Sequence, residues 1–135
     1  TVLNTLDGNT TGEVNAATVT TLTGTAADAN TAYASFGITG LGNEAVTLSD
    51  TSLTSTVLNT LDGNTTGEVN AATVTNLTGT AATANTAYAS SGISGLGNEA
   101  VTLSDTSLAA DALNTTNTNT TGTTTSSISN SGTRG

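Results

Sequence analysis

This 135-residue chain lacks most of the side chains that perform chemistry in proteins. It has no His, Cys, Met, Pro or Trp, no Lys and no Gln, and its only basic residue is Arg134. A Ser-His-Asp triad, a cysteine nucleophile, a His/Cys zinc site and a lysine Schiff base therefore cannot form within it. We expect a protein that is not an enzyme and that carries no cofactor, calcium being the one exception left open below.

Positive charge and long apolar runs are also scarce. The formal net charge is −9, and a single cation cannot neutralise a phosphate backbone, so we expect no nucleic-acid partner. Anionic membrane surfaces are disfavoured for the same reason, and no run of about 18 apolar residues exists that could insert into a bilayer. No initiating Met or signal peptide is visible, and we interpret the chain as a processed protein or, preferably, a piece of a longer one.

Threonine, with 35 residues, is the most frequent residue in the chain. Leu, Ile, Val and Phe together make only 25 of 135 residues, a level at which disorder must be considered. Pro, Lys and Gln, which disordered chains favour, are nevertheless missing. Such a chain can fold if its few large apolar side chains all point to one side, which regular repetition would achieve.

Internal repetition is the strongest signal in the sequence. Residues 1–55 align with 56–110 without a gap, and 49 of the 55 pairs are identical. The six differences are Thr21/Asn76, Asp28/Thr83, Phe36/Ser91, Thr39/Ser94, Thr54/Ala109 and Ser55/Ala110. We expect 1–55 to be repeat 1, 56–110 repeat 2, each of two turns, and 111–135 a degenerate partial repeat or a linker.

Each 55-residue unit has an inner period. Residues 21–37 align with 47–63 at an offset of 26, which indicates about 27 residues per turn. In 50–63 the apolar residues recur at helical spacing at Leu53, Val57, Leu58 and Leu61. The pattern predicts a helix that begins after Asp50 as N-cap and ends at Gly63.

A second helix is predicted within 24–37. Ala29, Ala32, Tyr33 and Phe36 form its apolar stripe, with a capping-box spacing of Thr25 and Asp28 before it and Gly37 after it. Because Phe36 becomes Ser91 in an otherwise near-identical copy, we expect position 36 to lie at the rim rather than in the core, or to contact a partner in one copy only.

The strand signals are weaker. Residues 45–49 alternate, with Val46 and Leu48 on one face, whereas 13–22 is rich in β-branched residues without a clean period of two and is expected to bend between two short strands. A helix and a strand recurring together favour an α/β repeat solenoid with one short parallel strand and one short helix per turn of about 27 residues. The alternative is a parallel β-helix in which the helical segments are loops.

The segment LDGNTTGEV at 6–14, which returns unchanged at 61–69, has two interpretations. Its first six positions from Asp7 resemble the start of an EF-hand calcium loop, but Thr18 stands where the closing Glu is required. The other interpretation is a corner that closes a helix and opens a strand. In the third copy Asp7 becomes Asn117 while the corner persists, which favours the second. The candidate calcium ligands are Asp7, Asn9, Thr11, Asp62, Asn64 and Thr66.

Two further patterns carry weaker hypotheses. T-x-T pairs such as Thr18/Thr20 and Thr73/Thr75 would rank hydroxyl and methyl groups on a flat face, as in ice-binding proteins, although threonine is also an ordinary strand residue. Asp28, Glu44 and Asp50 could pair as glycosidase carboxylates, but Asp28 is replaced by threonine in the second copy. The second pattern does not change the expectation that the chain is not an enzyme.

The amino-acid sequence of the repeat resembles that of a known group of proteins. GTAADANTAYASFGITGLGNEAVTLSDTSL (24–53) and VLNTLDGNTTGEVNAATVTTLTG (2–24) are similar to tandem modules in giant secreted or cell-surface proteins of marine bacteria, including cyanobacteria, that are grouped with adhesin-like and haemolysin-type proteins. The resemblance covers about 110 residues and implies an extracellular, non-enzymatic structural repeat of a surface or filament-forming protein, whose partners are other copies of itself or flanking repeats. The calcium-binding nonapeptide of β-rolls is absent, so that calcium chemistry is not carried over. A calcium-dependent or ice-binding adhesin module is the alternative.

Overall fold

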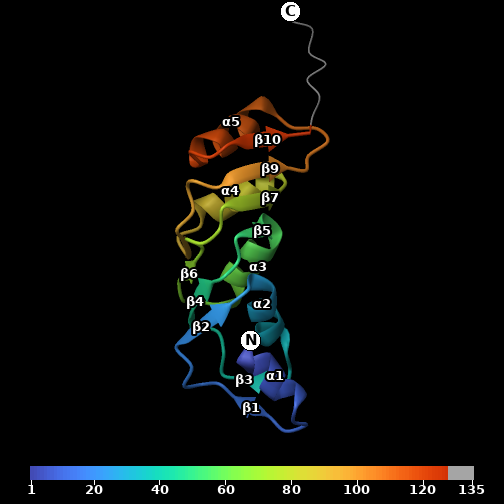
Figure 1. Ribbon diagram of the computed structural model, residues 1–135, viewed down its shortest axis with the longest axis vertical. Coiled ribbons are helices and arrows are strands. Elements are labelled where there is room, and N and C mark those ends of the chain that lie inside the picture. The colour runs from blue at the N-terminus through green and yellow to red at the C-terminus, as the bar shows by residue number, and fades with distance from the viewer. Residues whose placement is uncertain (128–135) are drawn as a thin grey trace, which may run out of the picture.

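The computed structural model describes residues 1–127; residues 128–135, including the isolated Ile128 of the third copy, lie outside the described part. The described chain is an α/β structure (Figure 1) with five short helices: α1 Val2–Gly8, α2 Ala26–Ala34, α3 Ser55–Asn64, α4 Ala81–Ala89 and α5 Ala110–Asn119. None of these helices is long and apolar enough to cross a membrane. Because the segments of the sequence that predict helices are helical, the alternative in which they are loops is wrong.

Ten short strands lie between and after the helices: β1 Val14–Asn15, β2 Thr21–Gly24, β3 Ile38–Thr39, β4 Ala45–Leu48, β5 Ser52–Thr54, β6 Val69–Asn70, β7 Asn76–Gly79, β8 Ile93–Ser94, β9 Ala100–Leu103 and β10 Thr124–Ser126. They form three sheets, ordered β1-β3, β2-β4-β6-β8 and β5-β7-β9-β10, and every pairing within the described residues is parallel.

Neighbouring strands in these sheets are close in sequence. Leu22 faces Val46 and Val46 faces Val69, which places partners 24 and 23 residues apart. Consecutive helices pack against each other in chain order from α1 to α5. The helices therefore ascend along the long axis of the molecule in the order of the sequence, from α1 at one end to α5 at the other (Figure 1).

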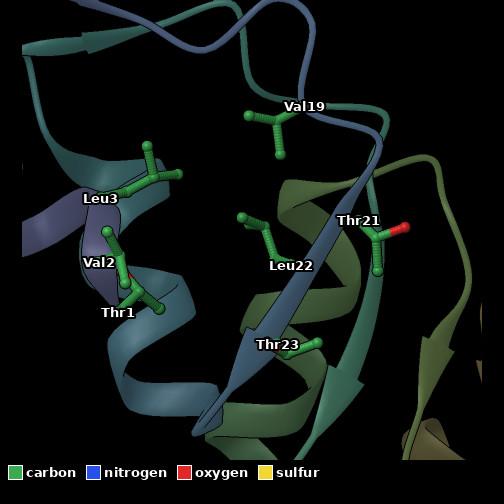
Figure 2. Close-up of a pocket in the computed structure, with 7 residues that line it drawn as sticks. All are labelled: Thr1, Val2, Leu3, Val19, Thr21, Leu22 and Thr23. Atoms are coloured by element: carbon green, nitrogen blue, oxygen red, sulfur yellow. The ribbon is translucent and has the colours of Figure 1, made fainter.

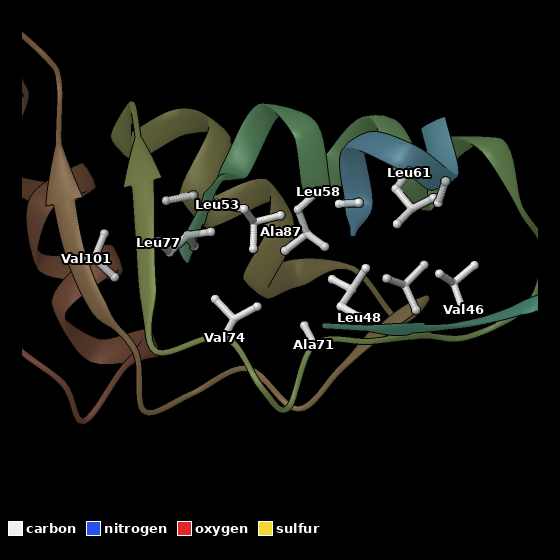
Figure 3. Close-up of a cluster of buried hydrophobic side chains, with 14 of the residues drawn as sticks. Val46, Leu48, Leu53, Leu58, Leu61, Ala71, Val74, Leu77, Ala87 and Val101 are labelled. Atoms are coloured by element: carbon white, nitrogen blue, oxygen red, sulfur yellow. The ribbon is translucent and has the colours of Figure 1, made fainter. Parts of the chain in front are cut away.

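The core lies between the strands and the helices. Strand β4 buries alternate residues, Val46 and Leu48, as the period of two predicts. Figure 3 shows leucines and valines from the strands facing Leu58 and Leu61 of α3. The helices contribute mostly alanine, because short side chains allow backbones to approach closely; in α2 and α4 the buried residues are Ala26, Ala29 and Ala32, and Ala81, Ala84 and Ala87.

The predicted helix within 24–37 is confirmed with shorter bounds, as α2. The Thr25 side chain accepts a hydrogen bond from the Asp28 backbone N–H at 3.1 Å, as an N-cap does. The helix ends at Ala34, so Gly37 does not terminate it; a Cβ at Gly37 would instead collide with the Asp7 carboxylate. Phe36 is fully exposed, which confirms the expected position outside the core.

The predicted helix within 50–63 is wrong in its first part. Helix α3 begins at Ser55, with Thr54 as N-cap, and runs through Gly63 to Asn64. Leu53 lies in β5, because this segment pairs with β7 and strand hydrogen bonds replace the first helical turn. Asp50 does act as a cap, but for the preceding helix: its carboxylate accepts from the first amide of α2 at 2.8 Å, and Asp105 does the same for α4.

The expectation of one strand per turn is also wrong. Two strands precede α2 and α4, and three precede α3, because the chain turns corners between short strands instead of extending one. The predicted bend within 13–22 is confirmed by β1 and β2. In the described part of 111–135, α5 packs on α4 and β10 pairs with β9, so this segment is folded against the rest of the chain.

Candidate functional site

The repeated corner at 61–69 packs against the GLGNE segment at 40–44. The Thr65 hydroxyl donates to the backbone oxygen of Glu44 at 2.6 Å and accepts from the Gly67 N–H at 3.0 Å. A Cβ at Gly67 would overlap the same Glu44 carbonyl, so only glycine allows this approach. Thr120 makes the equivalent two bonds to Glu99 and Gly122. The corner thus connects neighbouring turns through its threonine and glycine, which explains why these residues persist in the third copy.

A buried glutamate lies beside the second and third corners. Glu44 has no exposed surface, and its Oε2 accepts from the Tyr33 hydroxyl at 2.9 Å and from the Gly42 N–H at 2.8 Å. Its Oε1 is buried without a hydrogen-bond partner among the described residues. In the second copy both oxygens of Glu99 accept from the Gly97 N–H, and Oε2 also accepts from Tyr88. These arrangements close the tight turn of the GLGNE segment from inside.

The environment of the glutamates affects the tyrosines. Burial raises the pKa of Tyr33 to about 12; the hydrogen bond with Thr65 opposes this shift, and the adjacent Glu44 adds to it. Burial raises the pKa of Tyr88 in the same direction, with Glu99 adding to the shift. Both phenols therefore stay protonated as donors throughout the neutral range.

In the second copy, the structure gives each candidate calcium ligand a different protein partner. The Asp62 carboxylate accepts from the Ser90 hydroxyl at 2.6 Å, and the Asn64 amide donates to Asn30 of α2 at 2.9 Å. The Thr66 hydroxyl donates to the backbone carbonyl of Gly42 at 3.4 Å. Three side chains with separate partners do not form a ready cation cage.

The first copy is more open. Asp7 accepts from the Ser35 hydroxyl at 2.7 Å, and Asn9 and Thr11 are exposed. Across residues 1–127 no three carboxylate, His or Cys side chains gather as a metal site would require. Binding of calcium through backbone oxygens is a separate question, and the calcium hypothesis stays a prediction.

The three acids considered as glycosidase groups have unrelated roles. Glu44 is buried beside the second corner, Asp50 caps α2 from the next turn, and Asp28 is an exposed residue in the first turn of α2. Because the three carboxylates lie in unrelated environments, no two of them are placed to flank one glycosidic bond as a catalytic pair.

Sequence reasoning missed a set of asparagines that connect successive helices. In each case the side-chain amide donates to a backbone carbonyl of the next helix, at 2.9 to 3.3 Å: Asn4 to Asp28, Asn30 to Val57, Asn59 to Thr83 and Asn85 to Ala112. An available signal was the Asn-Thr pair that recurs in the middle of each helical segment, as LNT or ANT. Asparagine is a mediocre helix former, so its recurrence there needs a tertiary reason.

The two ends of the molecule differ in polarity. At the N-terminal end a hollow of about 210 Å³ opens between α1 and β2. Figure 2 shows Leu3, Val19 and Leu22 gathered around it. On the same end Val2 is 85% exposed and Leu6 49% exposed, whereas Leu61, the counterpart of Leu6 in the second copy, is 0% exposed. We call the apolar surface around this hollow the N-terminal face; Val2 and Leu6 are its exposed residues, and Leu3, Val19 and Leu22 line it from the core.

A row of threonines crosses the sheet formed by β5, β7, β9 and β10. The register of β5, β7, β9 and β10 places one threonine of each strand side by side: Thr54, Thr78, Thr102 and Thr125. The neighbouring row begins Ser52, Asn76, Ala100 and is not threonine. The T-x-T pairs Thr18/Thr20 and Thr73/Thr75 lie outside the strands and are not part of this row.

Comparisons of the chain with protein families, curated proteins and solved structures found no match.

Proposed function

We propose that the chain is a non-enzymatic structural segment of an extracellular surface or filament-forming protein, folded as a solenoid of about 27 residues per turn. The observation that carries this proposal is the parallel pairing of strands 23 or 24 residues apart together with helices that pack in chain order. In this arrangement each turn contacts only its neighbours, so length can grow without changing the core.

Recurring contacts support the proposal. Asn4 and Asn59 occupy the same position in two copies and bond the next helix in the same way. The caps from Asp50 and Asp105 recur likewise across turns. A mechanical role fits this chemistry, because each added turn would bring its own core residues, amide hydrogen bond and cap.

The charge of the chain fits a hydrated, exposed role. Ten acids and one cation leave an acidic surface without lysine, which resists association with other acidic surfaces and offers trypsin-like proteases no cleavage site before Arg134. The resemblance to giant cell-surface proteins supports the same location. In this proposal the chain projects from a cell or lengthens a filament.

The test is length. Chains with one, two and three added copies of residues 1–55 are expected to gain about 10 Å in maximum dimension per copy, because two turns stack at the strand spacing of about 4.8 Å. Small-angle X-ray scattering measures this dimension in solution. Growth with the cube root of chain length would indicate a globule and would refute the solenoid.

A second candidate function is ice binding, favoured by the row of threonines on the sheet of β5, β7, β9 and β10. Four hydroxyl and methyl groups at strand spacing present a regular row, although only one row is continuous. Thermal hysteresis of the chain, compared with Thr102→Leu on the exposed row, is the test. No hysteresis in the original chain would remove this candidate.

A calcium-dependent adhesin module is the remaining alternative. Thermal melting with and without millimolar calcium tests it, because a bound cation raises the melting midpoint by mass action. The Asp62→Asn chain is the matched control: a calcium-induced shift should disappear with this carboxylate if it is a ligand. A midpoint that calcium does not move would eliminate the alternative.

A further inference from the structure

The chain contains sequence motifs that a purely structural role does not use. N-linked glycans are attached to asparagine in Asn-x-Ser/Thr motifs in which x is not proline. Five such motifs lie in the described residues, and they begin at Asn9, Asn64, Asn76, Asn114 and Asn119. The sugar would be carried by the side-chain amide nitrogen, so the contacts of this nitrogen decide which motif can hold a glycan in the folded chain.

Three of the five motifs occupy the repeated corner. Asn9, Asn64 and Asn119 are the same position in the three copies. The amide of Asn64 donates to the side-chain oxygen of Asn30 in α2 at 2.9 Å, and the amide of Asn119 donates to that of Asn85 in α4 at 3.2 Å. A glycan on this nitrogen would break a contact between turns. The corner position is therefore a structural one, and the exposure of Asn9 does not make it an acceptor.

The fourth motif occupies a position that connects helices. Asn114 in α5 corresponds to Asn4 in α1 and to Asn59 in α3. Both counterparts donate through the same nitrogen to a backbone carbonyl of the next helix, at 2.9 Å. In a stacked chain this nitrogen serves the contact between helices, so the motif at Asn114 is not a suitable acceptor either.

Asn76 differs from the other four because it lies in the middle of a sheet, with a strand on each side. In the register of β7 it stands between Ser52 of β5 and Ala100 of β9. Its side chain is exposed, and its amide donates to the hydroxyl of the adjacent Thr75 at 3.3 Å, a contact that connects no turns. Because Ser52 and Ala100 have small side chains, the neighbouring strands leave room for a sugar at this point.

The whole motif of Asn76 faces outward. Thr78, its third residue, lies two positions along the strand and therefore on the same face of the sheet, whereas Leu77 points into the core and is 0% exposed. The first copy has Thr21 at the position of Asn76, which is one of only six differences between the copies. Since β2 forms with threonine and β7 with asparagine, the fold leaves this position free to vary.

We propose that Asn76 is the acceptor of an N-linked oligosaccharide when the chain is exported across a membrane that holds an oligosaccharyltransferase. The donor is an oligosaccharide linked to a lipid through a diphosphate. The Asn76 amide nitrogen bonds to C1 of the first sugar, and the bond between C1 and the phosphate oxygen breaks. The lipid diphosphate leaves with the bonding electrons, and the amide nitrogen releases one proton.

The proposal rests on the extracellular location in the proposed function, because the donor and the enzyme belong to the export route. It gives the sheet of β5, β7, β9 and β10 a role beyond stacking. A hydrophilic glycan at Asn76 projects from the exposed face of this sheet, two residues from Thr78 in the row of threonines. The glycan therefore shields this face without touching the core or the contacts between turns.

The experiment is secretion of the chain from a eukaryotic cell line that attaches N-linked glycans, followed by intact-mass measurement and mapping of glycopeptides. Asn76→Thr installs the residue of the first copy and removes the acceptor. Thr78→Val removes the recognised hydroxyl but keeps the acceptor and a β-branched side chain. Asn64→Gln removes a corner motif and is the matched control, and Thr21→Asn creates the same motif on exposed β2.

We expect the folded, secreted chain to carry one glycan, at Asn76, and the Asn64→Gln chain to carry the same one. The Asn76→Thr and Thr78→Val chains should lose the mass of one glycan, and the Thr21→Asn chain should gain a second. Enzymatic removal of the glycan should leave the melting temperature unchanged, because the nitrogen of Asn76 connects no turns.

A folded chain without a glycan at Asn76, or with its glycan at Asn64 or Asn119 instead, overturns the proposal. Translation into isolated microsomes gives the same mass shift as a readout and does not require secretion. The length series that tests the solenoid uses chains made without glycans, so failure of the acceptor leaves the proposed architecture intact.

Discussion

Helices α1 and α3 share the segment VLNTLDG, which allows one packing prediction to be tested with an internal control. Leu6 and Leu61 lie at the same position of the same VLNTLDG sequence, but Leu6 is 49% exposed and Leu61 0%. Replacing either by alanine changes intrinsic helix propensity equally, so the difference between the two variants reports burial alone.

The magnitude follows from the burial. Leu61→Ala removes a fully enclosed side chain and should lower the free energy of unfolding by about 2 to 5 kcal/mol, through lost transfer energy and the cavity left behind. Leu6→Ala removes a half-exposed side chain next to solvent, where no cavity forms, and should cost about 1 kcal/mol. Since domains of this size are stable by about 5 to 15 kcal/mol, the first loss is a large share of the total and the second is small.

Urea unfolding followed by far-ultraviolet circular dichroism measures both values. The chains should be dilute, so that contact between copies does not protect Leu6. Equal losses at the two positions would mean that Leu6 and Leu61 are equally covered, and would refute the reasoning from burial.

Three further outcomes are expected. The pKa of Tyr33 is raised to about 12 and that of Tyr88 is raised in the same direction. Phenolate absorbance should therefore be largely absent at pH 10 in the folded chain, whereas both tyrosines should titrate near pH 10 in denaturant. The raised pKa stabilises the folded state below pH 10, and this stability is lost as the pH rises through 12. An ordinary titration of the folded chain near pH 10 would contradict the burial. Asp50→Ala should cost about 1 kcal/mol in urea unfolding and Asp50→Asn much less, because asparagine also caps; equal costs would exclude the capping role. Thr65→Val should lower the free energy of unfolding by about 1 to 3 kcal/mol, because the buried Glu44 carbonyl loses its hydrogen-bond donor. An unchanged stability would mean that this hydrogen bond does not hold the corner against the GLGNE segment.

Local patterns in the sequence accounted for several elements correctly. Helix α2, strand β4 and the bend between β1 and β2 follow from apolar spacing and capping residues close to one another in the chain. The exposure of Phe36 followed from comparing two copies that otherwise agree. These features depend on contacts within a few residues, or on the repetition of the sequence, and both can be read from the sequence alone.

The errors arose where partners lie about one turn apart. Leu53 has helical spacing with Leu61, yet it belongs to a strand, because β7 offers backbone partners that local spacing does not reveal. Asp50 is a good cap by type, but which helix it caps depends on which amide lies nearby in space. Likewise, the asparagines that connect the helices and the glutamates beside the corners have meaning only once the turns are stacked.

The sequence by itself determined the repetition, the acidic charge, the absence of most catalytic side chains and the identity of the corner residues. Tertiary structure decided what the corner is for: Thr65 and Gly67 fit against Glu44 of the preceding turn, and Asp62 bonds Ser90. It also decided which identical residues are buried and which are not. Leu6 and Leu61 share every neighbour in sequence, and only the presence of a covering turn distinguishes them, because burial is a property of what packs on a residue and not of the residue.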